Sequence, residues 1–225
     1  MVEIGPGRGA LTIYLLARAD RVVAIEIDRY LAQRLAPRVG QVVSPAASSL
    51  EVIEANALEI DLAQWGPAVF TGNLPYYAAT AIMERVMALG PLVRRGVFLA
   101  QKEVAQRITA SPGSRDYGYL SVAMQVSADI ELLFEVPPEA FHPPPKVDSV
   151  VLRFQPHDRA AELGIADRPG FLRFISRCFR QKRKTLRNNL APQYGAAVDN
   201  WPEVNLRAEQ IGISMFADMY RRLVT

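Results

Sequence analysis

The stretch Gly72-Asn-Leu-Pro-Tyr-Tyr77 places an amide, a proline and two tyrosines between two patterned segments. The apolar run 68–70 before it predicts a buried strand, and residues 80–89 after it have helical periodicity. Asn73 would therefore stand at the carboxyl end of a strand, where open α/β sheets bind ligands. The alternative is an ordinary strand-to-helix turn, with Pro75 near the first helical turn and both tyrosines packed as core.

These residue types could act on a flat base that carries an amine. An exocyclic adenine amine is a poor nucleophile because its lone pair is delocalised into the ring. The Asn73 side-chain oxygen and the Leu74 carbonyl could accept hydrogen bonds from both N–H groups and favour a tetrahedral nitrogen. Pro75 would stiffen the turn, and Tyr76 could stack on the base. If the attacked methyl is activated by a sulfonium, no metal or covalent intermediate is required, so positioning and electrostatics should dominate.

A glycine-rich turn, EIGPGRGALT, lies near the start of the sequence. Gly5, Gly7 and Gly9 permit a tight backbone and the close approach of a ligand. Such a turn is weak evidence alone, since nicotinamide enzymes and many others carry one after a strand. Glu3 lies inside the preceding strand, where a buried carboxylate needs a cationic or donor-rich partner. An acid there suits the ammonium group of an amino acid, or a sulfonium-bearing ligand, better than a phosphate.

Two more polar residues follow the next predicted strands in order. Glu26 ends the second strand, where an acid can accept both hydroxyls of a ribose. The alternative is an exposed strand-end carboxylate, with Asp28 as a competitor for the role. Asn56 follows the third strand and could meet an adenine amino group. Together with the glycine turn and Asn73, these residues follow four successive strand ends, which is far more specific than any one of them.

The elements that must position these residues alternate between two patterns. Short apolar runs alternate with helical patterns through the first two-thirds of the sequence, which predicts βαβ units and a mainly parallel sheet. The later runs ADIELLFEV and DSVVLRF are joined by residues 137–147 without a helix-length pattern, so we expect an antiparallel hairpin that closes one sheet edge. The helical patterns comprise residues 10–19, 30–39, 80–89 and 103–110.

The pattern changes after Phe154. Residues 155–170 are polar and broken by Pro and Gly, which indicates a domain boundary. The segments FLRFISRCF, RKTLRNNLA, LRAEQIG and MFADMYRRL that follow have helical spacing and no strand pattern. We therefore predict an α/β domain over residues 1–157 and a small all-α domain over residues 158–225.

Composition excludes several classes of protein. Half of the 225 residues are apolar, which excludes a disordered or collagen-like chain. No apolar run approaches the roughly 20 residues needed to span a bilayer, and the N-terminus lacks a signal-peptide pattern. The single cysteine, Cys178, excludes an internal disulfide, and with only two histidines no structural zinc site is expected. We expect a cytoplasmic protein without a metal.

Positive charge is concentrated in one segment, although the net charge is only +3. No acidic residue occurs from Pro169 to Val198. Charge runs are usually solvated faces, but an acid-free segment of this length also matches the electrostatic footprint of a polyphosphate partner. The residues predicted to contact phosphates are Arg180, Lys182, Arg183, Lys184 and Arg187.

Over almost its whole length the sequence resembles the ribosomal RNA adenine N6-dimethyltransferases. The resemblance is carried by EIGPGRGALT, VVAIEID, GNLPYY, FHPPPKVDSVVLRF and RKTLRNNL, and the order of NLPY and PPPKVDS is highly specific. It implies a Rossmann-like methyltransferase fold with contacts to S-adenosylmethionine from Gly5, Glu26, Asn56 and Asn73. It also implies a grip on the target adenine by Asn73, Leu74, Pro75 and Tyr76, with Phe141 stacked on the other face.

The implied reaction transfers two methyl groups to N6 of each of two adjacent adenosines in the 3′-terminal hairpin of small-subunit (16S) rRNA. The implied partner is that rRNA or the assembling 30S subunit, with no membrane and no obligate protein partner. An amide, Asn56, stands where the family usually has an acid, so we expect weaker donor binding. The family also carries a donor-enclosing segment before the first strand, whereas this sequence begins inside that strand, and we expect lower donor affinity for it.

Several alternatives remain. A large-subunit rRNA adenine methyltransferase of the antibiotic-resistance type has the same chemistry and fold, but RKTLRNNL and the triple proline favour the small-subunit enzymes. An RNA-binding ribosome-assembly factor could keep this fold with little catalysis. A nicotinamide dehydrogenase is disfavoured because no acid/base pair for hydride transfer is recognisable. A DNA amino-methyltransferase fits the chemistry, but the basic tail favours structured RNA.

Overall fold

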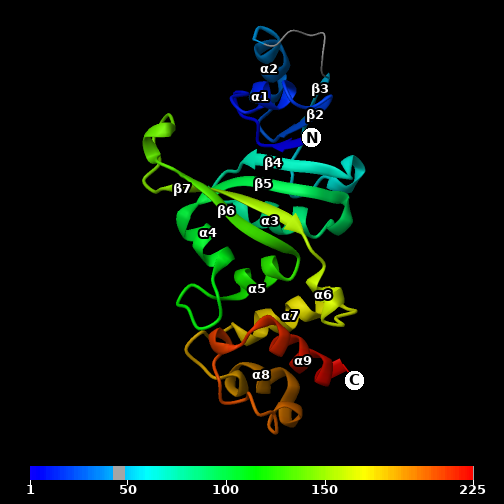
Figure 1. The fold of residues 1–225 in the computed structure, drawn as a ribbon, viewed down its shortest axis with the longest axis vertical. Coiled ribbons are helices and arrows are strands. Elements are labelled where there is room, and N and C mark those ends of the chain that lie inside the picture. Colours follow the sequence, from blue (N-terminus) through cyan, green and yellow to red (C-terminus); the bar gives the residue numbers. More distant parts are fainter. Residues whose placement is uncertain (43–48, 225) are drawn as a thin grey trace. The chain divides into compact units, whose positions relative to one another are not determined.

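The computed structural model describes residues 1–42 and 49–224 (Figure 1). By their contacts the residues form two compact units. Unit 1 comprises Met1–Ala105 and Asp129–Pro156, and unit 2 comprises Gln106–Ala128 and His157–Thr225.

Unit 1 is built on a seven-stranded sheet with the strand order β3-β2-β1-β4-β5-β7-β6 (Figure 1). The strands β1 to β5 pair in parallel, and β7 pairs antiparallel with β5. The predicted mainly parallel sheet, closed at one edge by the last two strands, is therefore confirmed. The strands are β1 (Val2–Ile4), β2 (Arg21–Glu26), β3 (Ser49–Glu54), β4 (Ala68–Asn73), β5 (Val93–Gln101), β6 (Ala128–Val136) and β7 (Ser149–Pro156).

Helices between the parallel strands pack their apolar residues on the sheet. Helix α2 (Arg29–Gly40) begins at Asp28, whose carboxylate accepts a hydrogen bond from the Leu31 N–H. Its residues Leu35 and Val39 lie one turn apart and are buried in the same cluster as strand residues of β2. The other helices between the parallel strands are α1 (Thr12–Leu16) and α3 (Ala79–Met87). Helix α4 (Lys102–Thr109) follows β5, and its residues up to Ala105 belong to unit 1 and the rest to unit 2.

Helix α1 begins at Thr12 rather than at residue 10 because the glycine turn extends up to it, and it ends at Leu16, three residues earlier than predicted. Gly9 has φ of +84°, a left-handed conformation that a right-handed helix cannot contain. A second glycine, Gly72, allows β4 to lie close to β1. A β-carbon at Gly72 would lie 2.3 Å from the Ile4 carbonyl oxygen, so only glycine fits directly before Asn73.

Unit 2 is helical, with one apolar core. Its helices are α5 (Tyr119–Gln125), α6 (Arg159–Glu162), α7 (Arg168–Cys178), α8 (Leu186–Tyr194) and α9 (Ile213–Val224). Residues 106–128 belong to this unit, which differs from the single predicted boundary after residue 157. The reason is packing, since Val122 and Val126 are buried in the same cluster as Phe171 and Phe174.

The C-terminal segment LRAEQIG was predicted to be helical, and this prediction is wrong. It contains only the 3-10 turn Ala208–Gln210, and Ile211 after it has an extended backbone. The Gln210 side chain accepts a hydrogen bond from the Arg207 N–H at 2.8 Å, which stabilises the turn locally. None of the helices in the described part of the chain is long and apolar enough to cross a membrane.

Tyr117 offers a test of the unit 2 core. Its side chain is fully buried, its hydroxyl has no hydrogen-bond partner among the described residues, and burial raises its pKa. Removing an unsatisfied buried hydroxyl recovers a desolvation cost of about 1–3 kcal/mol. We expect Tyr117→Phe to raise the free energy of unfolding by about 1 kcal/mol.

The measurement is urea unfolding of unit 2, followed by Trp201 fluorescence in a Trp65→Phe background. Tyr220→Phe is the matched control, because the Tyr220 hydroxyl donates to Asp167 at 3.3 Å. The control should lower the free energy of unfolding or leave it unchanged. Equal destabilisation by both substitutions would contradict an unsatisfied Tyr117 hydroxyl.

Candidate active site

The glycine turn after β1 is tied to the end of β2. Gly5 and Gly7 have φ of +69° and +57°, which glycine adopts without strain. The Gly5 N–H donates to the Ile25 carbonyl at 2.9 Å, and the Gly7 N–H donates to Glu26 Oε2 at 3.0 Å. The turn is therefore held by one backbone carbonyl and one carboxylate of the neighbouring strand.

Glu26 is the acid that faces this turn. Its side chain is only 6% exposed, and Oε1 accepts a second hydrogen bond from the Asp28 N–H at 2.9 Å. The alternative of an exposed strand-end carboxylate is wrong. The competitor Asp28 is engaged elsewhere, since its carboxylate caps helix α2.

Glu3 lies below the turn, inside β1, and is 1% exposed. Its Oε2 accepts a hydrogen bond from the Thr12 hydroxyl at 2.6 Å. Burial raises the pKa of Glu3 to about 7, against the lowering effect of the Thr12 hydrogen bond and with a further raising effect of Glu26. Glu3 therefore has the donor partner that its position requires, and it titrates near neutral pH.

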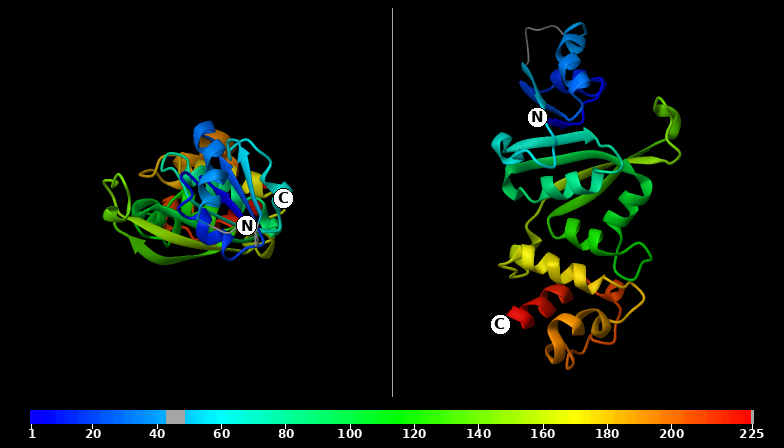
Figure 2. Two further views of the ribbon diagram at one scale, coloured as in Figure 1. Left: turned by 90° about the horizontal axis from the view of Figure 1, so that it is seen from above. Right: turned by 180° about the vertical axis from the view of Figure 1, so that it is seen from behind.

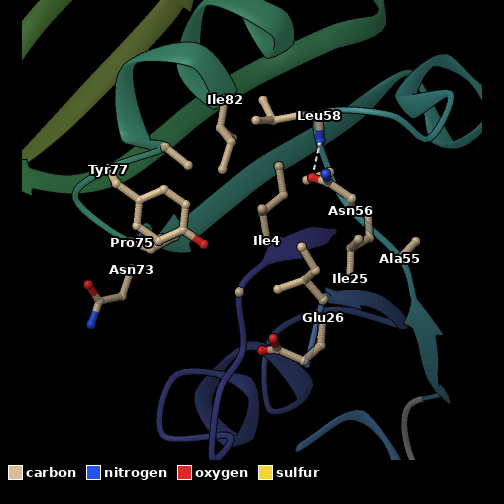
Figure 3. Close-up of a pocket in the computed structure, with 14 residues that line it drawn as sticks. Ile4, Ile25, Glu26, Ala55, Asn56, Leu58, Asn73, Pro75, Tyr77 and Ile82 are labelled. Atoms are coloured by element: carbon tan, nitrogen blue, oxygen red, sulfur yellow. Dashed lines mark hydrogen bonds between the residues drawn. The ribbon is translucent and has the colours of Figure 1, made fainter. Parts of the chain in front are cut away.

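A cavity of about 300 Å³ opens at the carboxyl ends of the parallel strands (Figure 3). This volume lies at the lower end of the range for small-molecule sites. Its wall combines apolar side chains with a few polar groups, the composition typical of a ligand site. The lining residues are Ile4, Gly5, Ile25, Glu26, Ile27, Ala55, Asn56, Ala57, Leu58, Asn73, Pro75, Tyr77, Ala78 and Ile82.

The NLPYY turn forms one side of this cavity. Leu74 is buried and anchors the turn, while the Asn73 amide points away from the apolar wall formed by Ile4, Ile25 and Ile82 (Figure 3). The turn begins where β4 ends, so the position of Asn73 is set by the sheet.

The two tyrosines of the turn are not core residues, so that alternative is wrong. Tyr76 is 37% exposed, and its hydroxyl lies 3.1 Å from Ser149 Oγ at the start of β7. Tyr77 is 85% exposed and lines the cavity, a position that the sequence analysis missed. The only sequence signal for Tyr77 was its place directly after NLPY.

Asn56 is held by its own loop. Its Oδ1 accepts from the Leu58 N–H at 3.0 Å, and its Nδ2 donates to Glu59 Oε1 at 2.8 Å. Arg85 of helix α3 fixes the same loop by donating to the Ile60 carbonyl at 2.7 Å. One lone pair of Oδ1 and one proton of Nδ2 remain for a ligand.

Of the residues predicted to contact the donor or the base, the structure brings five together in the cavity wall: Gly5, Glu26, Asn56, Asn73 and Pro75. Glu3, Gly7, Leu74 and Tyr76 lie next to this wall rather than in it. The described residues contain no group of three or more His, Cys, Asp or Glu side chains placed to hold a metal ion.

The family model "Ribosomal RNA adenine dimethylase" matches residues 1–223. The chain belongs to this family. A relative named "Ribosomal RNA small subunit methyltransferase A" from Acidobacterium capsulatum is 42% identical, over 99% of this chain and 81% of its own length. A protein of the same name from Bordetella bronchiseptica is also 42% identical, over 96% of this chain and 80% of its own length.

Solved structures support the fold of this rRNA adenine dimethylase. A dimethyladenosine transferase from Plasmodium falciparum superposes with a TM-score of 0.76 at 24% identity, covering 99% of this chain and 87% of that chain. The 23S rRNA methyltransferase ErmE superposes with a TM-score of 0.67 at 24% identity, covering 100% of this chain and 90% of that chain. The predicted methyltransferase fold is thus confirmed.

Phe141 of this rRNA adenine dimethylase lies outside the cavity wall. It belongs to the connection between β6 and β7, where its N–H donates to the Pro138 carbonyl at 3.1 Å. This yellow-green connection extends beyond the sheet in both views (Figures 1 and 2). Its contact with a target base stays a prediction.

The predicted phosphate-contacting residues of the dimethylase lie on the turn between α7 and α8 and at the start of α8, and all five are exposed. The buried Asn189 organises this turn, because its side chain accepts from the Gln181 N–H at 3.0 Å and donates to the Gln181 carbonyl at 3.2 Å. Lys182 donates to the Arg115 carbonyl, and Arg187 pairs with Asp199 at 3.1 Å. The remaining three, Arg180, Arg183 and Lys184, have no ion-pair partner in the described part of the chain.

The raised pKa of Glu3 gives the dimethylase a testable pH dependence. A carboxyl whose folded pKa is about 7, against 4.5 in the unfolded chain, contributes stability that is fully present below pH 4.5 and is lost as pH rises through 7. The wild-type protein should therefore lose up to about 3 kcal/mol of unfolding free energy between pH 5 and pH 8 from this group.

The measurement is urea unfolding of unit 1, followed by Trp65 fluorescence in a Trp201→Phe background at both pH values. Glu3→Gln keeps a group that can accept a hydrogen bond from Thr12 but cannot ionise. The variant should therefore lose clearly less unfolding free energy than the wild type between pH 5 and pH 8. Parallel pH profiles for the two proteins would show that Glu3 does not titrate in this range.

Proposed function

We propose that this protein transfers methyl groups from S-adenosylmethionine to N6 of two adjacent adenosines in the 3′-terminal hairpin of small-subunit rRNA. The observation that carries the proposal is the Asn73 amide at the carboxyl end of β4, beside a cavity that also contains Gly5, Glu26 and Asn56. The names of the relatives, which specify the small ribosomal subunit, support the choice of substrate. The proposal involves no metal and no obligate protein partner, and places the reaction in the cytoplasm.

The cavity residues fit S-adenosylmethionine, which would supply a methyl group activated by its sulfonium. Each Glu26 oxygen accepts one backbone N–H and keeps a lone pair for a ribose hydroxyl. Ile25 and Ile82 provide apolar surface for an adenine ring. Gly5 allows close approach, since a β-carbon there would lie 3.7 Å from the Asn73 carbonyl oxygen and would narrow the gap between the two turns.

Asn73 and Leu74 would activate the target amine. The Asn73 side chain is exposed, and neither its oxygen nor the Leu74 carbonyl has a hydrogen-bond partner among the residues that the structure describes. Both oxygens can therefore accept from the amine as its nitrogen becomes tetrahedral. Leu74 is buried, so its backbone is fixed before the base arrives, and such preorganisation is the main source of rate in reactions of this kind.

The target adenine must leave its stack to reach Asn73, which costs a few kcal/mol. Tyr76 is placed to recover part of this cost by stacking, because its hydroxyl contact with Ser149 fixes the ring beside the turn. Phe141 would cover the other face of the base once the β6–β7 connection approaches it. The basic turn between α7 and α8 would bind phosphates of the same RNA.

Asn73→Ala tests the activation of the amine. It removes one preorganised acceptor, so we expect methyl transfer to small-subunit RNA to fall by about 10²–10³-fold. Melting temperature and RNA binding should be unchanged, because the side chain is exposed at the end of its strand.

The assay measures methyl incorporation into the purified RNA or into 30S particles from a strain that lacks the modification. Asn188→Ala, an exposed asparagine of α8, is the matched control and should keep full activity. Wild-type rates for Asn73→Ala would rule out the proposed role of the NLPY turn. A wild-type protein that binds this RNA but transfers no methyl group to it would favour the assembly-factor alternative.

The basic turn should determine much of the salt dependence of RNA binding. Each phosphate contact contributes about 0.9 to the slope of log K against log salt on duplex RNA or DNA. The triple variant Arg180→Gln/Arg183→Gln/Lys184→Gln should therefore flatten the slope by a little under three, with unchanged donor affinity. Titrations at several salt concentrations measure this slope.

The matched control for the basic turn removes three exposed arginines of unit 1, Arg18, Arg94 and Arg95, in the same way. If both triple variants flatten the slope equally, net charge rather than the turn between α7 and α8 determines RNA affinity.

A further inference from the structure

Helix α2 has an unbalanced basic face. No Asp or Glu occurs between Asp28 and Glu51, whereas α2 itself contains three arginines. Two of them, Arg34 and Arg38, follow Tyr30 at intervals of four residues. Residues four apart on a helix are surface neighbours, so these three side chains form one row.

This row faces the glycine turn across a second cavity, of about 150 Å³. Gly7 and Arg8 line it from the turn, and Tyr30, Arg34 and Arg38 line it from α2. All of these residues belong to unit 1. This second cavity lies next to the cavity of about 300 Å³ proposed to bind the methyl donor, called the donor cavity below. Gly7 connects the two, because its N–H is hydrogen-bonded to Glu26 in the wall of the donor cavity.

The positive charge in this second cavity is not neutralised within the described part of the chain. Arg8, Arg34 and Arg38 are exposed and form no ion pair there. The acids nearest to α2 along the sequence are already engaged, Glu26 with two backbone N–H groups and Asp28 with the start of α2. Glu3, the acid nearest to Arg8, is buried and accepts a hydrogen bond from the Thr12 hydroxyl. Two like charges four residues apart also disfavour the helix. An anion between the arginines would relieve that repulsion.

The shape of the row suits a nucleic acid better than a simple ion. The Arg34 guanidinium lies 3.7 Å from the centroid of the Tyr30 ring, and Tyr30 is 62% exposed. A guanidinium fixed on an aromatic face is oriented to bind phosphate through two parallel hydrogen bonds. The exposed ring beside it can stack with a base or a ribose.

A membrane surface is a poorer match for this face. Helices that lie on membranes expose an apolar face beside the basic one. The larger aliphatic residues of α2 point inward: Leu35 and Val39 are buried in the core cluster with Leu16 and Val22, and Leu31 is half-buried.

We propose that Arg8, Arg34 and Arg38, with Tyr30, form a second RNA-binding surface that contacts phosphates beside the donor cavity. The inference rests on the proposed function, because the ligand is the RNA substrate itself. RNA held there would follow the outer side of the glycine turn, while the donor lies on its inner side. The surface thus contributes to substrate affinity, and the chemistry stays with Asn73.

The test compares Arg34→Gln/Arg38→Gln with the matched control Arg94→Gln/Arg95→Gln, which removes two exposed arginines of β5 from the same unit. The probe is a labelled hairpin with the 3′-terminal small-subunit sequence, and methyl transfer to the same RNA gives KM and kcat. We expect the first variant to raise KM and Kd for RNA about tenfold near 0.1 M salt and to flatten the salt slope by about 1.5–2. Its kcat and donor affinity should change less than twofold, and the control should match wild type.

Each outcome decides the inference. Equal effects of the two double variants, or none from the first, would overturn the second surface even if wild type methylates the RNA. Failure of the wild-type protein to methylate the RNA would overturn the proposed function. Even then, loss of hairpin binding in Arg34→Gln/Arg38→Gln but not in the control variant would support the second RNA-binding surface. Binding of the wild-type protein to vesicles that contain anionic lipid is measured as well. If the protein binds these vesicles more tightly than the RNA hairpin, the proposal that this surface binds RNA is overturned.

Discussion

The buried carboxylate of Glu26 is the contact on which the candidate site depends. It accepts one N–H from the glycine turn at Gly7 and one from the start of the next segment at Asp28. Hydrogen bonds to an ionised acceptor are about twice as strong as those between neutral groups, so one side chain fixes two loops. The donor cavity on one side of the turn and the arginine row on the other both rest on this contact.

The sequence was sufficient to predict the mainly parallel sheet, from the alternation of strand and helix patterns, and four residues of the cavity wall, from one geometric rule. Carboxyl ends of parallel strands meet at one edge of a sheet, so polar residues after successive strands must converge there. Gly5, Glu26, Asn56 and Asn73 obey this rule. Tyr77 was missed because its neighbour Tyr76 fitted the same pattern, and the contact of Tyr76 with Ser149 of β7, which tells the two rings apart, is not visible in local sequence.

The insertion of residues 106–128 into unit 2 could not be predicted for a related reason. Its apolar residues have the spacing of any amphipathic helix, and spacing does not tell which core a helix joins. Only the three-dimensional contacts of Val122 and Val126 with the Phe171 and Phe174 cluster decide this. The role of Asn56 was likewise open from sequence, because its bonds to Leu58 and Glu59 involve loop geometry that no pattern specifies.

The two basic surfaces orient their charges by different physical means. The turn between α7 and α8 is held by the buried Asn189, whose side chain makes two hydrogen bonds to Gln181, and by an antiparallel bridge between Thr185 and Arg207. On α2 the helix itself sets the spacing, and the Tyr30 ring orients Arg34. A sequence scan for charge finds the first surface, because its charges are contiguous. It misses the second, whose charges are four residues apart and are completed by Arg8 from another element.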